Sequence, residues 1–192
     1  GRLYLSPTAE HTKAAEVPRP EGLSDAELPE QALGFRVQNY GLKRWVDLFT
    51  KRQLVAMATL SDLIAEVREQ VLVDGLISGV PEGDLLERGG SDAQAYADAV
   101  ATYLALGVSR ATDYNSTLAG WNSLRDGMRN VFARQALPML WDFAEANFFS
   151  NSSGSFLGQV DWVSRVLEHV PADISGDVEQ VSASLASYGG VV

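Results

Sequence analysis

The sequence predicts a mainly α-helical protein of about four helices, with an extended N-terminal arm and one or more short strands at the C-terminal end. Three observations support this fold class. Apolar residues recur at steps of three and four over much of the chain, as on one face of a helix. Capping patterns, a Ser or Thr followed three residues later by Gln, precede two of these segments. A change of pattern toward strands appears only after Gly176.

Residues 1–33 form the predicted arm, since they contain four of the seven prolines and show no sustained period. Ser24-Asp25-Ala26-Glu27 predicts one short helical turn in the arm, and Pro29 stops it. We assign residues 34–175 to a helical domain and residues 176–192 to the strand region.

The first long helix is predicted to begin at Thr50, whose hydroxyl caps the helix while Gln53 reaches back and Phe49 packs as the apolar staple. Glycines loosen its end and Pro81 closes it. Its apolar face is predicted to comprise Leu54, Met57, Ala58, Ile64, Val67, Val71 and Leu72.

The second helix is predicted from Ser91 to about Thr112, opened by the pattern Ser91-Asp92-Ala93-Gln94. Its predicted core face consists of Tyr96, Val100, Tyr103, Leu104 and Val108. A stripe of small residues, which would let a neighbouring helix approach closely, consists of Ala93, Ala97, Ala101 and Ala105.

An irregular connector over 113–126 is rich in Asn, Ser and Gly. A third helix is predicted over roughly 127–146, where Pro138 either kinks it or starts a new turn. A fourth, over about 155–170, ends at Pro171. Its predicted buried residues are Phe156, Val160, Val163 and Leu167. The strand pattern occupies Val178 to Leu185, and Gly190 to Val192 resembles the start of another strand.

Composition narrows the class of protein. The chain has 192 residues, 46% hydrophobic content and a mean hydropathy of −0.05, as in globular domains. It has no Cys, and its two His are far apart in sequence, which makes a poor basis for a metal site. No run reaches the length that spans a bilayer, and no signal peptide opens the chain, so we expect a cytoplasmic protein.

The net charge of −10 argues against a stand-alone nucleic-acid-binding domain, because phosphate neutralisation dominates such binding. The charge is uneven, however. Residues 34–54 contain five basic residues and one acidic residue, a local charge of +4. This cluster is either a polar contact region or an ordinary solvated loop and helix start, and short charge clusters favour the second interpretation.

An Arg-Gln pair follows Phe at two places in the chain, as Arg52-Gln53 and as Arg134-Gln135. A planar bidentate donor beside an amide and an aromatic ring suits anions or base edges, although the same grouping also pins buried loops. Asp142 and Glu145, three residues apart on the predicted third helix, have the spacing for acid–base work, but a solvated acidic face explains them more simply.

The chain lacks a Walker loop, a GxGxxG motif and a GxSxG motif. Trp121 and Trp141 have the chemistry to stack on a flipped base, although core packing is the commoner role of such tryptophans.

Four segments together resemble one family: 39–64 (NYGLKRWVDLFTKRQLVAMATLSDLI), 95–121 (AYADAVATYLALGVSRATDYNSTLAGW), 129–149 (RNVFARQALPMLWDFAEANFF) and 153–170 (SGSFLGQVDWVSRVLEHV). They are similar to the large adenine-specific DNA methylases of bacteria and archaea that carry a zinc ribbon and occur near phage-defence genes. The resemblance covers most of 35–192.

The resemblance implies a fragment of an S-adenosylmethionine-dependent DNA N6-adenine methyltransferase, within a larger α/β class I methyltransferase. The fragment would lie between the ribbon and the Asp-Pro-Pro-Tyr motif, with 176–192 leading into a truncated catalytic domain. The chain's start at Gly1 and its end on Gly-Gly-Val-Val also lead us to expect a piece of a longer protein.

Several departures from the family pattern matter. The chain lacks Asp-Pro-Pro-Tyr, the cofactor glycine motif and the ribbon cysteines. Lys51 and Phe148 stand where the family often has Pro. We therefore expect no activity and no bound S-adenosylmethionine from this chain alone.

The resemblance implies that the chain forms part of the walls of the active-site cleft and contacts DNA. The candidate DNA-binding or cleft residues are Arg52, Gln53, Asn115, Arg134, Gln135, Trp141, Asp142 and Asn147. For each of them a buried structural hydrogen bond is at least as good an explanation. Partner proteins of a defence system are a further expectation from the resemblance. The alternative from another class is a non-catalytic helical interaction module, which binds a protein through the apolar-aromatic face of 131–149.

Overall fold

A computed structural model describes residues 3, 5–32 and 34–171 of the chain. Within these residues the protein is mainly helical, with four α-helices and one small antiparallel pair of strands. The strands predicted after Gly176 lie outside the described residues. No helix within the described residues is long and apolar enough to cross a membrane.

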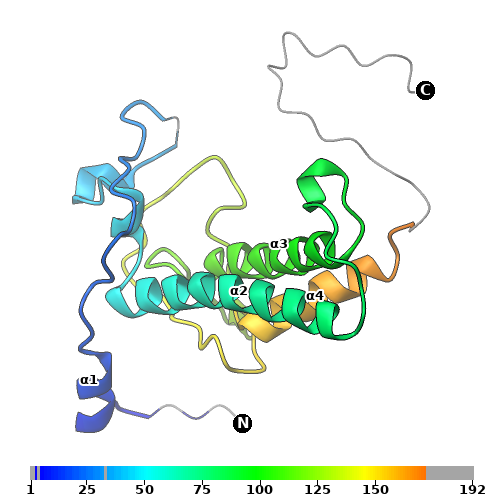
Figure 1. The fold of residues 1–192 in the computed structure, drawn as a ribbon. Coiled ribbons are helices and arrows are strands. Elements are labelled where there is room, and N and C mark those ends of the chain that lie inside the picture. Colours follow the sequence, from blue (N-terminus) through cyan, green and yellow to red (C-terminus); the bar gives the residue numbers. More distant parts are fainter. Residues whose placement is uncertain (1–2, 4, 33, 172–192) are drawn as a thin grey trace.

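Three helices form the main layer of the molecule (Figure 1). Helix α2 (Lys51–Ile77) and helix α3 (Ala93–Thr112) pack side by side in opposite directions, and α4 (Phe156–Leu167) packs against α3. The short helix α1 (Ala9–Ala15) lies apart from this layer on the N-terminal arm.

The predicted start of the first long helix is confirmed. The Thr50 hydroxyl accepts a hydrogen bond from the backbone N–H of Gln53, and the Gln53 side chain accepts one from the backbone N–H of Thr50. This reciprocal capping box satisfies two of the donors that every helix start leaves free. At α4 the Ser155 hydroxyl accepts a hydrogen bond from the Gly158 N–H, without a reciprocal side-chain bond because Gly158 has no side chain.

The predicted core face of the second helix is only partly correct. Tyr96 and Tyr103 are exposed, whereas small residues make the buried face of α3, namely Ala93, Ala95, Ala97, Gly107, Val108 and Ala111. The reason is the close approach of the helices. A Cβ added to Gly75 of α2 would lie 3.2 Å from the Cβ of Ala93, so no large side chain fits at this crossing. The predicted cap of α3 is also wrong in detail, because its N-cap residue Asp92 makes no side-chain capping bond.

The helix predicted over 127–146 does not form. The segment begins with β2 (Gly127–Met128), which pairs with β1 (Trp121–Asn122), and continues as irregular chain. Its backbone donors bond to distant partners instead of to carbonyls one helical turn back. The N–H of Arg129 donates to Gly120 and that of Ala144 donates to Ala119. Tertiary partners have therefore replaced the helical hydrogen bonds.

The helical turn predicted at Ser24-Asp25-Ala26-Glu27 is absent as well. Glu27 instead forms an antiparallel bridge with Arg44, because the N–H of Leu28 donates to the Lys43 carbonyl at 2.7 Å. Helical structure between 34 and 50 is limited to two short 3-10 turns, Val37–Tyr40 and Trp45–Leu48, and a third such turn, Leu86–Arg88, lies between α2 and α3.

Two apolar clusters form the core. The first joins the 24–50 segment to the irregular chain after α3, and its buried members are Leu28, Val37, Leu48, Leu118 and Leu137. The second lies among the three helices and contains Leu60, Val108, Ala111 and Phe148. Phe148 comes from the irregular segment, so this segment is anchored in the helical layer.

Candidate functional site

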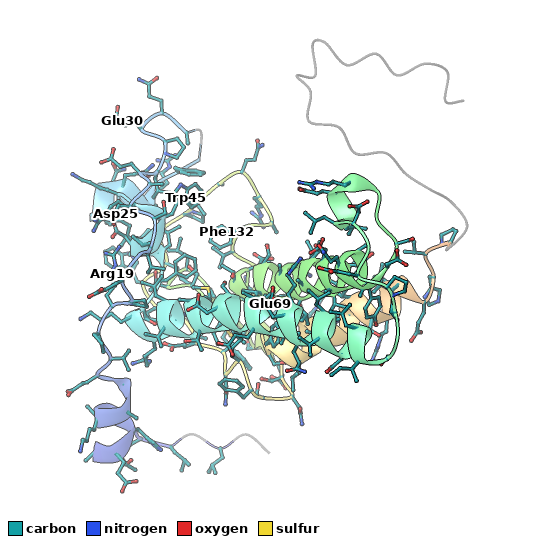
Figure 2. All side chains as sticks on the ribbon, viewed as in Figure 1. Arg19, Asp25, Glu30, Trp45, Glu69 and Phe132 are labelled. Atoms are coloured by element: carbon teal, nitrogen blue, oxygen red, sulfur yellow. The ribbon has the colours of Figure 1, made fainter. Side chains whose placement is uncertain are left out.

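A groove of about 450 Å³ opens between the 24–50 segment and the irregular segment 129–149. We call it the aromatic groove, and its lining residues are Ala32, Phe35, Trp45, Phe132, Arg134, Gln135 and Leu137. Figure 2 labels Trp45 and Phe132, which come from the two segments. The groove contains one of the two Arg-Gln pairs of the sequence.

A parallel backbone bridge between Phe35 and Leu137 forms the floor of the groove. The Arg36 N–H donates to the Leu137 carbonyl at 3.0 Å, and the Leu137 N–H donates to the Gly34 carbonyl at 3.2 Å. Gly34 has φ +83°, and a Cβ there would lie 2.9 Å from the Cβ of Ala136. Only glycine accommodates both the left-handed backbone and this contact at low cost.

Asp113 holds the wall that carries Phe132 and Arg134. Its carboxylate accepts hydrogen bonds from the backbone N–H groups of Val131 at 2.9 Å and of Phe132 at 2.7 Å, and also from the side-chain amide of Asn130. The wall is therefore fixed to the end of α3. Asp113 was not predicted as a site residue. The available signal was an acidic side chain at a helix C-terminus, where the helix dipole disfavours it.

Aromatic rings line the groove in paired contacts. Phe35 and Trp45 meet edge to face with ring centroids 6.3 Å apart, and Phe132 packs on Phe49 at 6.4 Å. Trp45 remains 39% exposed, so part of its indole is available to a ligand. Phe35 and Trp45 were not among the predicted site residues, because neither has a motif that marks it.

Arg134 and Gln135 are exposed at the groove, and within the described part of the chain neither side chain has a hydrogen-bond or ion-pair partner. A free guanidinium beside aromatic rings can bind an anion through its fork or stack on a planar group. The groove therefore combines a stacking surface with an anion-binding group.

The other Arg-Gln pair has a different environment. The Arg52 guanidinium forms a two-point ion pair with Glu145, Nε to Oε1 at 3.1 Å and Nη2 to Oε2 at 2.7 Å. The Glu145 carboxylate raises the pKa of Arg52 through this contact. The pair ties the start of α2 to the irregular segment.

The basic cluster predicted over 34–54 is partly neutralised in the same way. Arg44 pairs with Asp25 and with Asp47. Burial alone would raise the pKa of Asp47, but the backbone donors of Arg44 and Lys43 and the Arg44 guanidinium outweigh it and lower that pKa.

Gln53 and Asn115 are buried. Gln53 belongs to the capping box of α2, with its Oε1 2.8 Å from the N–H of Thr50. The Asn115 amide donates to the Ala111 carbonyl at 2.9 Å and to the Gly154 carbonyl at 3.0 Å. Both side chains thus bind backbone groups, and a DNA contact by either stays a prediction.

Trp141, Asp142 and Asn147 lie on the surface of the irregular segment. The Trp141 ring is 75% exposed and meets Tyr40 edge to face at 5.1 Å. Asn147 shapes a turn, since its Oδ1 accepts the Phe149 N–H at 2.9 Å. Because no helix forms here, Asp142 and Glu145 do not share a helix face, as the acid–base interpretation required. The candidate residues therefore divide among the groove, the buried interior and this surface.

Metal-ligating side chains do not gather in the described residues: no group of three or more His, Asp or Glu there is placed to hold a metal ion. Comparison with protein-family models, with curated proteins and with solved structures finds no match to the chain. The methylase resemblance rests on the four sequence segments alone.

Proposed function

We propose that the chain is the helical part of an S-adenosylmethionine-dependent DNA N6-adenine methyltransferase, and that the aromatic groove contacts the DNA. The observation that carries this proposal is the unpaired Arg134 beside Phe35, Trp45 and Phe132. Aromatic rings stack on bases of any sequence, and arginine pairs with phosphate or with a base edge. Residues outside this chain would bind the cofactor and transfer the methyl group.

The groove suits single-stranded or unstacked nucleotides better than a closed duplex. Phe35 and Phe132 are partly buried and part of the Trp45 ring is exposed, so a base has to leave its stack to meet the face of a ring. The overall charge of −10 is consistent with a local contact within a larger enzyme, because long-range attraction of DNA would need a basic surface.

Binding of a fluorescein-labelled, adenine-rich single-stranded oligonucleotide, followed by anisotropy, tests the groove. We expect Trp45→Ala and Arg134→Ala each to weaken binding about tenfold, since stacking of one base contributes about 1–3 kcal/mol. Arg88→Ala, an exposed arginine on the turn between α2 and α3, is the matched control. Equal binding by the wild type and both groove variants would remove the DNA contact from the proposal.

Calorimetry with S-adenosylmethionine tests the enzyme assignment separately. We expect no binding by the 192-residue chain and binding by a chain extended at both ends. Absence of binding by both would favour the interaction module, and binding by the short chain would show that the cofactor site has been placed wrongly.

One observation favours the interaction module as the second candidate. The irregular segment exposes Trp141, Phe143 and Phe149, and such large apolar groups on a surface often mark a protein interface. This surface is not the helical face that was predicted over 131–149, because the segment is irregular.

The sequence that follows Val192 in the gene distinguishes the two candidates. An Asp-Pro-Pro-Tyr motif directly after Val192 would support the methyltransferase.

A further inference from the structure

A second groove lies at the opposite end of the helical layer from the aromatic groove. It has a volume of about 510 Å³ and is lined by residues from the end of α2 and the start of α3. These two helix ends lie next to each other in Figure 1. We call it the acidic groove, and its lining residues are Val71, Asp74, Gly75, Ser78, Val80, Ser91, Asp92, Ala93 and Tyr96.

The walls of the acidic groove present apolar surface to solvent. Tyr96 is 65% exposed and Val80 is also exposed. At the base of the groove Gly75 and Ala93 bring the helices close together, so their larger neighbours form the sides. A groove with apolar walls between two helices has the shape that receives an amphipathic helix.

The stretch of sequence that forms this groove is strongly acidic. Residues 62–98 contain nine acidic and two basic side chains, a net charge of −7 within a total of −10. One of the two arginines, Arg68, is bound to Asp98 at 2.7 Å and to Glu69 at 2.8 Å, so it is already neutralised.

The carboxylates at the rim have only neutral partners among the described residues. Asp74 accepts a hydrogen bond from the Gln70 amide at 2.7 Å, and Glu82 accepts one from the Gln94 amide at 2.9 Å. Asp92, the N-cap residue of α3, makes no side-chain capping bond. The rim therefore keeps a negative charge that no cation of the described chain offsets.

We propose that the acidic groove binds a basic amphipathic segment of a partner protein. The apolar side of that segment would cover Tyr96, Val80 and Val71, and its Lys and Arg side chains would meet Asp74, Asp92 and Glu82. Complementary charge of this kind accelerates encounter and fixes orientation. The proposal does not depend on the proposed function, since it concerns other residues at the other end of the helices.

The chain itself offers no suitable occupant after α4. Residues 172–192 contain three acidic residues and no Lys or Arg, so their charge has the same sign as the rim. The same groove of a second copy is a poor match for the same reason, because two surfaces of equal negative charge repel each other.

The proposal is tested by measuring the binding of a fluorescein-labelled helical peptide to the 192-residue chain by fluorescence anisotropy. In this peptide, pairs of Leu alternate with pairs of Lys. A peptide with Glu in place of Lys is the control probe. We expect the basic peptide alone to bind, Tyr96→Ala to weaken it about tenfold, and Asp74→Asn with Asp92→Asn to weaken it by about two- to fivefold per charge. Asn is as good an N-cap residue as Asp, so α3 should keep its start.

Glu30→Gln removes the same charge from the far end of the molecule, where Figure 2 labels Glu30, and should leave peptide binding unchanged. Equal binding of both peptides, or equal weakening by Glu30→Gln, would overturn the proposal. So would a dimer in sedimentation equilibrium that Tyr96→Ala dissociates, since a second copy would then cover the groove. Circular dichroism of each variant checks that its helices are intact.

Discussion

At the scale of single residues, Asn115 connects two parts of the molecule. Its side-chain amide bonds to the last turn of α3 and to the Gly154 carbonyl before α4. Gly154 has φ +87°, and a Cβ there would lie 2.7 Å from the Cβ of Ala146, so the turn is packed tightly against the irregular segment. A fully buried amide in such a place acts mainly on stability.

We expect Asn115→Ala to lower the free energy of unfolding by about 2–3 kcal/mol, because two hydrogen bonds from a buried amide to backbone carbonyls are lost. Urea unfolding followed by circular dichroism measures this. Asn147→Ala, in an exposed turn of the irregular segment, should lower the free energy of unfolding by less than about 1 kcal/mol. A loss at Asn115 no greater than that at Asn147 would contradict the assigned role.

The ion pair between Arg68 and Asp98 makes stability depend on acid pH. The backbone N–H of Leu86 lowers the pKa of Asp98, burial opposes this, and the Arg68 guanidinium lowers the pKa further. A carboxyl group whose pKa is lower in the folded state stabilises the protein above its unfolded pKa of about 3.9. That contribution disappears as the pH falls through the folded pKa.

We therefore expect Asp98→Asn to cost about 1 kcal/mol at neutral pH and much less once the pH lies below both pKa values. Urea unfolding of the wild type and of Asp98→Asn over a pH series measures the difference. Glu66→Gln, on the exposed surface of α2, controls for a general charge effect. A constant difference at all pH values would show that the lost contact is not electrostatic.

At the scale of elements, the start of α2 tests how much a local signal contributes. Thr50→Ala removes the hydroxyl that accepts the Gln53 N–H, and we expect a loss of about 1 kcal/mol in the free energy of unfolding. Thr59→Ala, in the exposed middle of the same helix, should be neutral or slightly stabilising because alanine has the higher helix propensity. Thermal unfolding of both variants, compared with the wild type, measures the two changes in stability. Equal losses would mean that the capping box contributes little.

The helices that the sequence predicted correctly have their start signals within a few residues. Thr50 with Gln53 is such a pattern, and interactions within the first turn were sufficient to place the start of α2. The segment 127–146 has the composition of a helix, yet Asp113, Ala119 and Gly120 lie outside it and take its backbone donors. The sequence of 127–146 by itself contains none of these hydrogen-bond partners, so the helix predicted for that segment was wrong.

The same reasoning applies to the aromatic groove. Arg134 and Gln135 were identified because their side chains are chemically distinctive. Phe35 and Trp45 join them through long-range contacts, among them the backbone bridge between Phe35 and Leu137 over about a hundred residues of sequence. The pattern of residues could therefore suggest the chemistry of the groove but not its walls.

At the scale of the whole molecule, the two grooves lie at opposite ends of one helical layer. The aromatic groove is formed by irregular chain, whereas the acidic groove is formed by two helices. Asp113 and the Arg52–Glu145 pair both join the irregular segment to the helices. The helical layer therefore supports the irregular segment, and the Asp113 hydrogen bonds hold the wall of the aromatic groove that carries Phe132.

If Asp113 positions the groove wall, Asp113→Ala should loosen that wall while leaving the helices intact. Three hydrogen bonds are lost at one place, so local opening becomes easier than global unfolding. We expect backbone hydrogen exchange, followed by mass spectrometry, to accelerate about tenfold or more over 129–137 and to stay unchanged over 51–77, since each lost bond contributes about 1 kcal/mol. Asp142→Ala, an exposed acid of the same segment, should change neither region. Faster exchange over both regions would show that Asp113 stabilises the whole molecule. Unchanged exchange over 129–137 would show that the Phe35–Leu137 backbone bridge is sufficient to hold the wall.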